Sequence, residues 1–270
     1  MGATSCNSEK IMNFKTVLRK WLKRGLTTAG VLPTKYMWPN PFKIIEFEEL
    51  LARVTFHRND LVLDLGCGAG VQDFLIGRKA GKVVGIDISE TQIERANTLA
   101  RDYGSGLDLQ FICTAVERAE FCDNQFDKVV SFCVLEHIPN YEAVLTAVFR
   151  VLKSGGLLLL SVDSLATIDD LELLAKHKTD HSVHKYFRPD EIKSLLECVG
   201  FQRVSVYPVF RSPCAKRLFE KSIRNGFHFH RYRKFWSYLR LRVGEWRYRR
   251  AESGLFLCVR AVKPQCRGQN

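Results

Sequence analysis

Residues 62–70 read VLDLGCGAG, in which three glycines spaced two apart follow directly on a short apolar run. The run has the length and composition of a buried β-strand, and a helix is predicted over 70–80. A glycine-rich turn between a strand and a helix lets the backbone approach a ligand, and its free N–H groups favour polar ligand groups. The stretch therefore predicts a nucleotide-type binding turn in an α/β sheet.

The spacing of the glycines and of two nearby carboxylates narrows the class of ligand. A dinucleotide fingerprint, G-x-G-x-x-G, would need glycine at position 71, which is Val71. Asp64 lies inside the first strand, and Asp87 ends the second, where it is placed to accept both ribose hydroxyls of an adenosine. Two carboxylates without a phosphate-binding lysine suit a cationic cofactor such as S-adenosylmethionine. The alternative is that both aspartates only cap helices.

The chain around this turn alternates short apolar runs with amphipathic helical patterns. Nearly all-apolar strands with such helices between them predict a parallel sheet covered on both faces. The predicted strands are 61–65, 82–88, 107–114, 126–135, 157–162, 201–209 and 255–263. The predicted helices between 40 and 200 are 43–56, 70–80, 89–104, 140–152 and 189–199.

Four stretches, in this order, resemble the successive motifs of class I S-adenosylmethionine-dependent methyltransferases of the type 11 group. They are VLDLGCGAG, VVGIDIS, DNQFDKVVSFCVLEHIPN and VLKSGGLLLLSV. The group includes quinone-biosynthesis and glycan or glycolipid methyltransferases, and the resemblance covers roughly residues 40–205. It implies a Rossmann-like α/β fold whose seven-stranded sheet is mostly parallel, with helices on both faces and an antiparallel last strand. It also implies methyl transfer from S-adenosylmethionine.

The resemblance assigns the residues of the glycine turn to the methionine half of the cofactor. Gly66, Cys67 and Gly68 would line the methionine part, and Asp64 would meet its amino group. Asp87 would hold the ribose.

The same resemblance places further residues around the adenine and the methyl group. Ile88 would cover the adenine face, and Cys133, at the end of the fourth strand, would lie beside the cofactor. The group often carries an Asp-Ala pair beside the adenine, where this chain has Ala115 and Val116. A backbone N–H would then serve the ring, and we expect somewhat weaker cofactor binding.

One motif of the group departs from its usual form in this chain. A subset of the quinone O-methyltransferases carries a metal-binding E-x-x-E-H at the end of the fourth strand. Here the stretch reads Cys133-x-x-Glu136-His137. Because a thiol suits a hard cation such as Mg²⁺ poorly, we expect metal-independent transfer and no metal site.

Methyl transfer to a hydroxyl needs alignment of the reactants and a group that removes the proton. His137 follows the fourth strand and is either this base or a structural residue. His177, His181 and His184 fall in a stretch after the fifth strand that we predict to be a polar loop. That loop either lines the acceptor pocket, with His184 or His181 as the base, or binds a metal, or is merely solvated.

The net charge of +12 is concentrated in two segments of the chain. Residues 211–250 hold thirteen Lys/Arg and two Asp/Glu, and residues 1–30 hold six and one. The stretch 31–210 carries 19 basic and 25 acidic residues and is therefore acidic overall. An acidic body with two basic appendages indicates an anionic partner.

The two basic segments also carry aromatic and aliphatic side chains. Residues 10–26 predict an amphipathic helix, and 211–250 contain nine aromatic residues and a predicted helix over 230–243. Aromatic rings among arginines fit an anionic membrane surface, or RNA with its bases stacked on the rings. We favour the membrane, with nucleic acid less favoured; the third alternative is a solvated helical cap.

The sequence thus predicts an enzyme that O-methylates a small or lipid-linked acceptor at a membrane surface. The alternatives are an RNA-directed methyltransferase that uses 211–250, and a non-catalytic protein with this fold. Nine cysteines without a C-x-x-C pair, and no apolar stretch of ~20 residues, favour a cytoplasmic, peripheral protein. The first ten residues lack the apolar core of a signal peptide. The predicted parts are 1–39 (basic helix and cover loop), 40–210 (core), 211–254 (basic helical insertion between strands 6 and 7) and 255–270 (last strand and tail).

Overall fold

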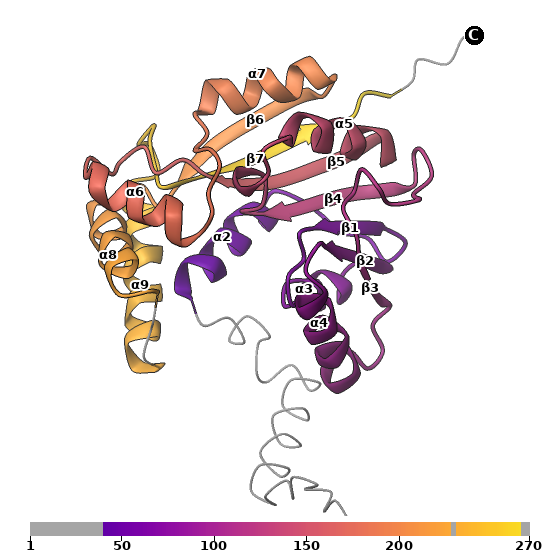
Figure 1. Cartoon of the computed structure of the whole chain (residues 1–270), viewed down its shortest axis with the longest axis horizontal. Helices are drawn as coiled ribbons and strands as arrows, with labels where there is room; N and C mark the ends of the chain where they lie inside the picture. The colour runs from indigo at the N-terminus through magenta and orange to yellow at the C-terminus, as the bar shows by residue number, and fades with distance from the viewer. Residues whose placement is uncertain (1–39, 228–230, 266–270) are drawn as a thin grey trace, which may run out of the picture.

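The computed structural model describes residues 40–227 and 231–265, and its centre is a seven-stranded sheet in the order β3-β2-β1-β4-β5-β7-β6 (Figure 1). The strands are β1 (Leu61–Leu65), β2 (Lys82–Asp87), β3 (Leu109–Cys113), β4 (Phe126–Phe132), β5 (Leu152–Asp163), β6 (Gln202–Val209) and β7 (Phe256–Val262). Strands β1 to β5 pair in parallel, and β7 is antiparallel to both β5 and β6. The mostly parallel sheet with an antiparallel last strand is confirmed.

Two apolar cores cover the two faces of the sheet, as predicted. Helices α5 (Tyr141–Val151) and α7 (Pro189–Val199) pack on one face. The other face is covered by α2 (Pro41–Leu51), α3 (Asp73–Gly77), α4 (Glu90–Tyr103), α8 (Pro213–Arg224) and α9 (Arg231–Arg247). The basic insertion between β6 and β7 is helical, and it forms two helices, α8 and α9, where one was predicted.

Local sequence signals set several helix ends. The side chain of Asn40 accepts a hydrogen bond from the Phe42 N–H (2.9 Å) at the start of α2. Ser89 caps α4 in the same way, and α7 ends at Gly200, whose φ of +113° suits glycine. These caps explain why α4 and α7 begin and end close to their predicted positions.

Several expectations about the elements are wrong in detail. The helix predicted over 70–80 is limited to α3, because the turn that precedes it occupies the first residues. The predicted polar loop after β5 contains a helix, α6 (Leu171–Asp180), which begins at the Asp170 cap and includes His177. The helix predicted over 43–56 ends at Leu51. The helix predicted over 10–26 lies outside the described residues.

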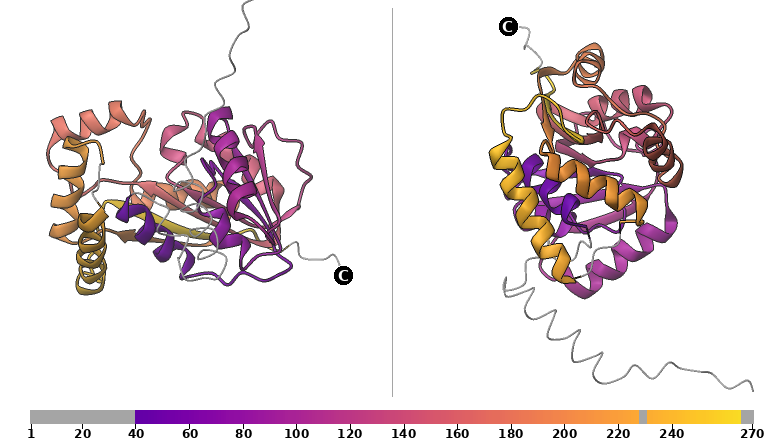
Figure 2. Two further views of the ribbon diagram at one scale, coloured as in Figure 1. Left: turned by 90° about the horizontal axis from the view of Figure 1, so that it is seen from below. Right: turned by 90° about the vertical axis from the view of Figure 1, so that its left-hand side faces the viewer.

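The helices α6, α8 and α9 gather at one end of the molecule, away from α4 (Figure 2). Their mutual contacts, and those of α9 with α2, join the insertion to the body of the fold. Strands β1 and β4 are neighbours at the centre, which is the point where strand order reverses and where ligands bind in such sheets. Within the described ranges, no helix has both the length and the apolar character needed to cross a bilayer.

Candidate functional site

The glycine turn is held rigidly at the carboxyl end of β1. The Gly66 and Cys67 N–H groups both donate to the Ile86 carbonyl, at 2.8 and 2.9 Å. Gly66 and Gly68 have φ values of +72° and +53°, and a Cβ on Gly66 would lie 2.4 Å from Val134 Cγ2. A Cβ on Gly68 would meet no described atom within 4 Å, so the turn is open on that side. The turn therefore forms a small open cradle next to the end of β4.

Asp87 ties the end of β2 to this turn. Its Oδ2 accepts the Gly68 N–H (2.9 Å), and its Oδ1 accepts the Ser89 N–H (2.8 Å). Each carboxylate oxygen keeps a second lone pair for a ligand hydroxyl. The next residue, Ile88, is 81% exposed and offers an apolar surface beside the carboxylate.

Asp64 lies under the turn and is fully buried. Its Oδ2 accepts from Gln72 Nε2 (2.8 Å), while its Oδ1 and both oxygens of the buried Asp73 meet no hydrogen-bond donor among the described residues. Burial raises the pKa of Asp64 to about 7, and burial beside Asp64 raises the pKa of Asp73 well above its usual range. Burial therefore favours the neutral, protonated form of both carboxyl groups.

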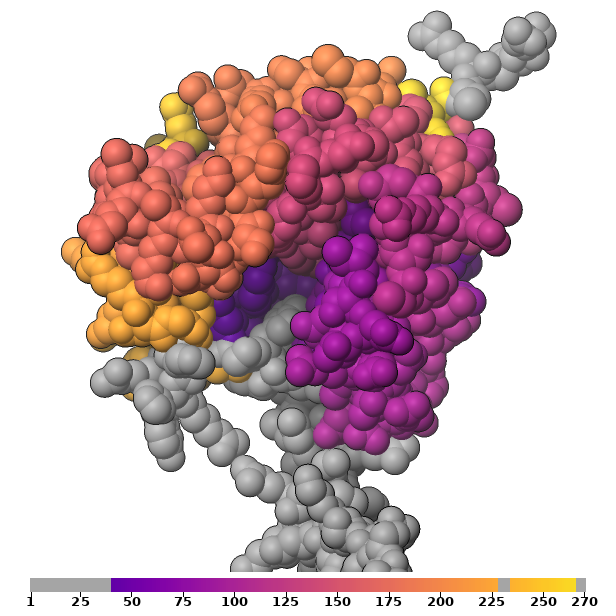
Figure 3. Space-filling model, viewed as in Figure 1, coloured from indigo at the N-terminus to yellow at the C-terminus, as the bar shows by residue number. Residues whose placement is uncertain are grey.

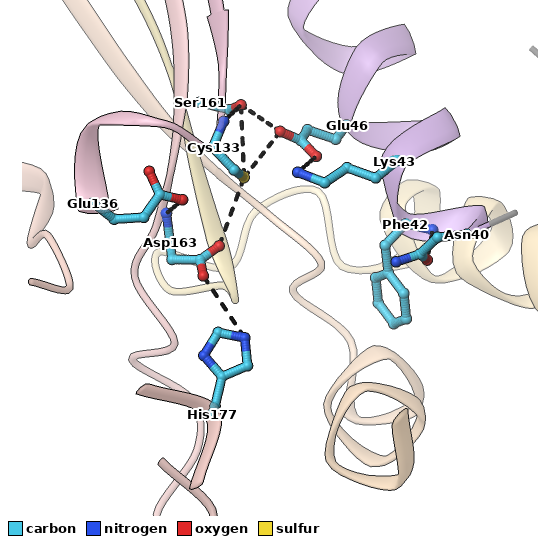
Figure 4. Close-up of polar contacts among 9 residues, drawn as sticks. All are labelled: Asn40, Phe42, Lys43, Glu46, Cys133, Glu136, Ser161, Asp163 and His177. Atoms are coloured by element: carbon cyan, nitrogen blue, oxygen red, sulfur yellow. Dashed lines mark hydrogen bonds and ion pairs between the residues drawn. The ribbon is translucent and has the colours of Figure 1, made fainter. Parts of the chain in front are cut away.

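A second group of polar side chains lies where β4 and β5 end, and we call it the buried polar cluster (Figure 4). Its members are Lys43, Glu46, Cys133, Glu136, Ser161 and Asp163. They come from α2, from β5, and from the end of β4 with the short 3-10 turn η2 (Leu135–His137) that follows it. The cluster thus joins three separate segments of the chain at one edge of the sheet.

The half of the cluster next to α2 is an ion pair held by hydrogen bonds. Lys43 Nζ lies 3.0 Å from Glu46 Oε2. The other oxygen, Glu46 Oε1, accepts from Cys133 Sγ (3.1 Å) and from the Ser161 hydroxyl. The Cys133 N–H in turn donates to the Ser161 carbonyl (3.1 Å). This half is internally neutral.

The other half of the cluster contains two carboxyl groups. The Asp163 N–H donates to Glu136 Oε1 (3.2 Å), and Glu136 Oε2 is buried without a donor among the described residues. Asp163 Oδ1 lies 3.6 Å from Cys133 Sγ, and its Oδ2 lies 3.9 Å from His177 Nε2. Asp163 is therefore the member placed between the cluster and α6.

A cavity of about 350 Å³ adjoins the cluster. Its apolar wall consists of five phenylalanines: Phe42, Phe132, Phe219, Phe227 and Phe256. Its polar lining consists of Asn40, Lys43, Cys133, His137, Asp163, His177 and His181. Figure 3 shows this face of the molecule hollowed between the lobe of α6 and α8 and the lobe of α3 and α4, with α2 at the floor.

Residues 56–202 match the family model described as a methyltransferase domain. The chain belongs to the class I S-adenosylmethionine-dependent methyltransferases. The chain is 31% identical to a ubiquinone biosynthesis O-methyltransferase of Dinoroseobacter shibae over 187 residues, 66% of this chain and 68% of that protein. It is also 31% identical to one of Rhizobium rhizogenes, over 58% of this chain and 65% of that protein. The chain therefore spans about two thirds of the length of these relatives.

Solved structures share the fold of this methyltransferase at lower identity. A phosphoethanolamine N-methyltransferase of Haemonchus contortus has a TM-score of 0.57 and 22% identity, over 81% of this chain and 53% of that one. The [4+2]-cyclase SpnF has a TM-score of 0.60 and 19% identity, over 82% and 80% of the two chains. At such identities the likeness concerns the fold alone, and it does not identify the acceptor.

The methyl donor of this methyltransferase is S-adenosylmethionine, and the glycine turn fits it. The open side of Gly68, the carboxylate of Asp87 and the exposed Ile88 form one continuous surface at the ends of β1 and β2. Of the two residues predicted to lie beside the adenine, Ala115 is half-buried and Val116 is fully buried in the core. The side chain of Val116 thus serves packing. The roles of these residues toward the cofactor stay predictions.

The protonation of the buried polar cluster follows from its burial and its few charges. Burial raises the pKa of Asp163 to about 7, against the lowering effect of the Lys43 ammonium. Burial and the neighbouring Asp163 also hold the pKa of Glu136 well above its usual range. Although burial opposes its charge, Lys43 has a raised pKa because acidic groups, Cys133 and Glu46 first, surround it. Asp163 is therefore the member that changes protonation near neutral pH.

The structure separates the three histidines predicted as bases. His137 and His181 line the cavity, and burial lowers the pKa of each. His184 is exposed and is absent from the cavity lining; its N–H donates to the Glu136 carbonyl (2.7 Å). His177, which sequence reasoning placed in a loop, is buried on α6 and bonds the Tyr186 hydroxyl through Nδ1 (3.0 Å). Burial lowers the pKa of His177 to about 4.

Sequence reasoning missed Lys43, Glu46 and Asp163 as site residues. Lys43 and Glu46 are spaced three apart in the otherwise apolar start of α2, PFKIIEF, which is the signal that could have found them. Cys133, Glu136 and Asp163 place one ligand-type atom each within 4.8 Å of one another. The Lys43 ammonium already supplies positive charge there, and the absence of a metal site stays a prediction.

Proposed function

We propose that this methyltransferase methylates a hydroxyl group of a small or lipid-linked acceptor, bound in the phenylalanine-lined cavity, at a membrane surface. The observation that carries the proposal is the position of Asp163. Its carboxyl group lines the cavity and belongs to the buried polar cluster. A carboxyl group that ionises near neutral pH is suited to accept a proton from a hydroxyl group.

Asp163 gives the cavity its proton acceptor. When bound, S-adenosylmethionine would supply an electrophilic methyl group, whose bond to sulfur breaks as the sulfur leaves in a neutral thioether. The hydroxyl oxygen of the acceptor gains a bond to carbon and loses its proton, which Asp163 takes up. An amine acceptor in its neutral form would need no such base in the bond-forming step, so Asp163 favours a hydroxyl.

Lys43 and the phenylalanines assist this step in different ways. The Lys43 ammonium lines the same cavity and stabilises the negative charge that develops on the hydroxyl oxygen. The phenylalanine wall holds the apolar body of the acceptor and keeps water from the reacting oxygen. An acceptor with an aromatic or isoprenoid body next to its hydroxyl group fits these two kinds of lining.

His137 and His181 are the alternative proton acceptors, since both line the cavity. Burial lowers the pKa of each, which keeps both neutral at physiological pH and therefore able to accept a proton. His184 would need to move to reach the cavity. The names of the relatives, ubiquinone biosynthesis O-methyltransferases, support a hydroxyl acceptor with a lipid tail.

The test is transfer of label from methyl-labelled S-adenosylmethionine to a cell extract, with lipid, nucleic-acid, protein and small-molecule fractions counted separately. Wild-type protein is expected to label the lipid or small-molecule fraction. Asp87→Ala and Asp163→Asn should both lose this label, the first with its cofactor binding and the second without. Asp123→Asn, an exposed carboxylate far from the cavity, is the matched control. Label found only in nucleic acid or protein would contradict the proposal.

A further inference from the structure

The outer face of α9 is the most apolar exposed surface in the described part of the chain. The described residues include eight exposed large hydrophobic side chains, and six of them fall between residues 235 and 248. They are Phe235, Trp236, Leu239, Val243, Trp246 and Tyr248. Trp236, Val243 and Trp246 are exposed to 61%, 60% and 72%. Such a concentration on one helix marks an interaction surface, because scattered exposure would need no explanation.

This face is exposed although α9 is firmly attached to the body of the protein. Leu241 and Glu245 of α9 are buried, and Glu245 pairs with Arg211 (3.2 Å). Arg242 binds Glu49 of α2 at 2.6 Å. The inner side of α9 is thereby fixed, and its outer side is presented in a defined orientation.

Arginines without acidic partners lie among these hydrophobic side chains. A groove of about 470 Å³ between α8 and α9 is lined by Trp236 and Val243 together with Arg217, Arg240 and Arg247. None of these three arginines forms an ion pair with a described residue, whereas Lys216 and Arg224 of α8 pair with Asp169 and Asp170. The groove therefore combines uncompensated positive charge with aromatic and aliphatic surface.

We propose that the α8–α9 face, defined by Trp236, Val243, Trp246, Arg217, Arg240 and Arg247, docks on an anionic lipid bilayer. Indole rings settle at the headgroup level, and arginines there meet lipid phosphates and carboxylates. The aliphatic Val243 and Leu239, exposed between the tryptophans, gain by burial in the interface. RNA bases stack on flat aromatic rings, so these two aliphatic side chains would not contribute to stacking with RNA. The charge and the aliphatic residues together therefore favour lipid.

The docking face and the acceptor cavity share α8. Phe219 of α8 and Phe227, just after it, line the cavity, whereas Pro213, Cys214 and Arg217 of α8 line the groove. A bilayer bound at the groove thus lies one helix away from the cavity. This inference rests on the proposed function only in that the docked surface would bring the lipid-linked acceptor to its site.

The experiment is flotation of the full chain with vesicles of phosphatidylcholine alone, or with about 30% phosphatidylserine. We expect binding to the anionic vesicles only, weakened at about 0.5 M salt. Trp236→Ser/Trp246→Ser and Arg240→Gln/Arg247→Gln should each reduce the bound fraction about tenfold or more. Leu171→Ser and Arg95→Gln, which change an equally exposed leucine and arginine elsewhere, are the matched controls and should bind as wild type.

Several outcomes would overturn the proposal. One is the absence of flotation. A second is unchanged flotation of both double variants, which would assign the anchor to another segment such as the basic residues 1–30. A third is binding of a single-stranded RNA probe, lost in the same variants, without binding to vesicles. Asp87→Ala protein should float as wild type, so a failure of methyl transfer and a failure of docking are separate results.

Discussion

The glycine turn and the phenylalanine-lined cavity draw their residues from very different lengths of chain. The turn is complete between Asp64 and Ser89, one strand–turn–helix–strand unit in which the Gly68–Asp87 bond closes the site. The cavity needs α2, the ends of β4 and β5, α6, α8 and β7, from Asn40 to Phe256. The buried polar cluster next to it is held together by contacts between distant residues. Cys133 and Glu46, for example, are 87 residues apart in sequence.

The two sites therefore differ in how strongly they depend on the rest of the fold. A local unit can keep its geometry while the rest of the chain changes, so the geometry of the glycine turn depends little on distant residues. The cavity depends on the relative placement of several elements, so its shape and charge depend on long-range packing. Substitutions in the two sites should therefore separate donor binding from acceptor chemistry.

The largest separation is expected for Asp163→Asn. The rate of label transfer should fall ~10²- to 10⁴-fold, because the cavity loses its proton acceptor. The affinity for S-adenosylmethionine should stay within about twofold of the wild type. In the wild type, kcat/KM should rise with pH through about 7, since the carboxylate must be ionised to accept a proton. A variant that keeps the wild-type rate and pH profile would return the role of base to His137 or His181.

The donor site should respond next most strongly, through Asp87→Ala. Loss of the carboxylate removes charge-assisted hydrogen bonds to ligand hydroxyls, each worth ~1.5–3 kcal/mol, and releases the Gly68 N–H. We expect about 100-fold weaker binding of S-adenosylmethionine by titration calorimetry. Asp123→Ala, on the surface, serves as the control. Unchanged affinity would show that the turn binds without this carboxylate.

A third test measures how the ionisation of Asp163 changes the stability of the folded protein. The pKa of Asp163 is raised in the folded protein, so folding retains a proton that the unfolded chain releases. The contribution of this group to stability is therefore lost as pH rises through about 7. The full pKa shift corresponds to at most ~4 kcal/mol of stability. We expect Asp163→Asn to raise the free energy of unfolding at pH 8 by about half of this, about 2 kcal/mol. The gain should vanish near pH 4, and thermal unfolding at both values would measure it.

The smallest expected effect belongs to Ile88→Ala. The side chain is 81% exposed, so the melting temperature should not change measurably. Burial of this side chain under the adenine ring is worth about 1 kcal/mol, and S-adenosylmethionine should bind about fivefold more weakly. An unchanged affinity would remove Ile88 from the donor site.

The sheet and its motifs were predictable because their signals are local. Strand β2 ends at Asp87, one residue before its predicted end, and helix α7 spans 189–199 as expected, since apolar periodicity and caps act within a few residues. His177 was placed in a loop because polar residues around it obscured the Asp170 cap of α6. Lys43 comes under the electrostatic influence of Cys133 and Asp163 only through the packing of α2 against the sheet, which no local pattern encodes.

Helix α2 has contacts at both ends that belong to different tasks. Its first turn carries Phe42 and Lys43 into the cavity, and its later residues Glu48 and Glu49 hold Tyr238 and Arg242 of α9. A helix of this length is a rod of roughly 16 Å, so both sets of contacts lie on one short support. If α2 moves as one body, a tilt of α9 displaces the ammonium of Lys43. The helix then acts as a lever between the outer helix and the cavity.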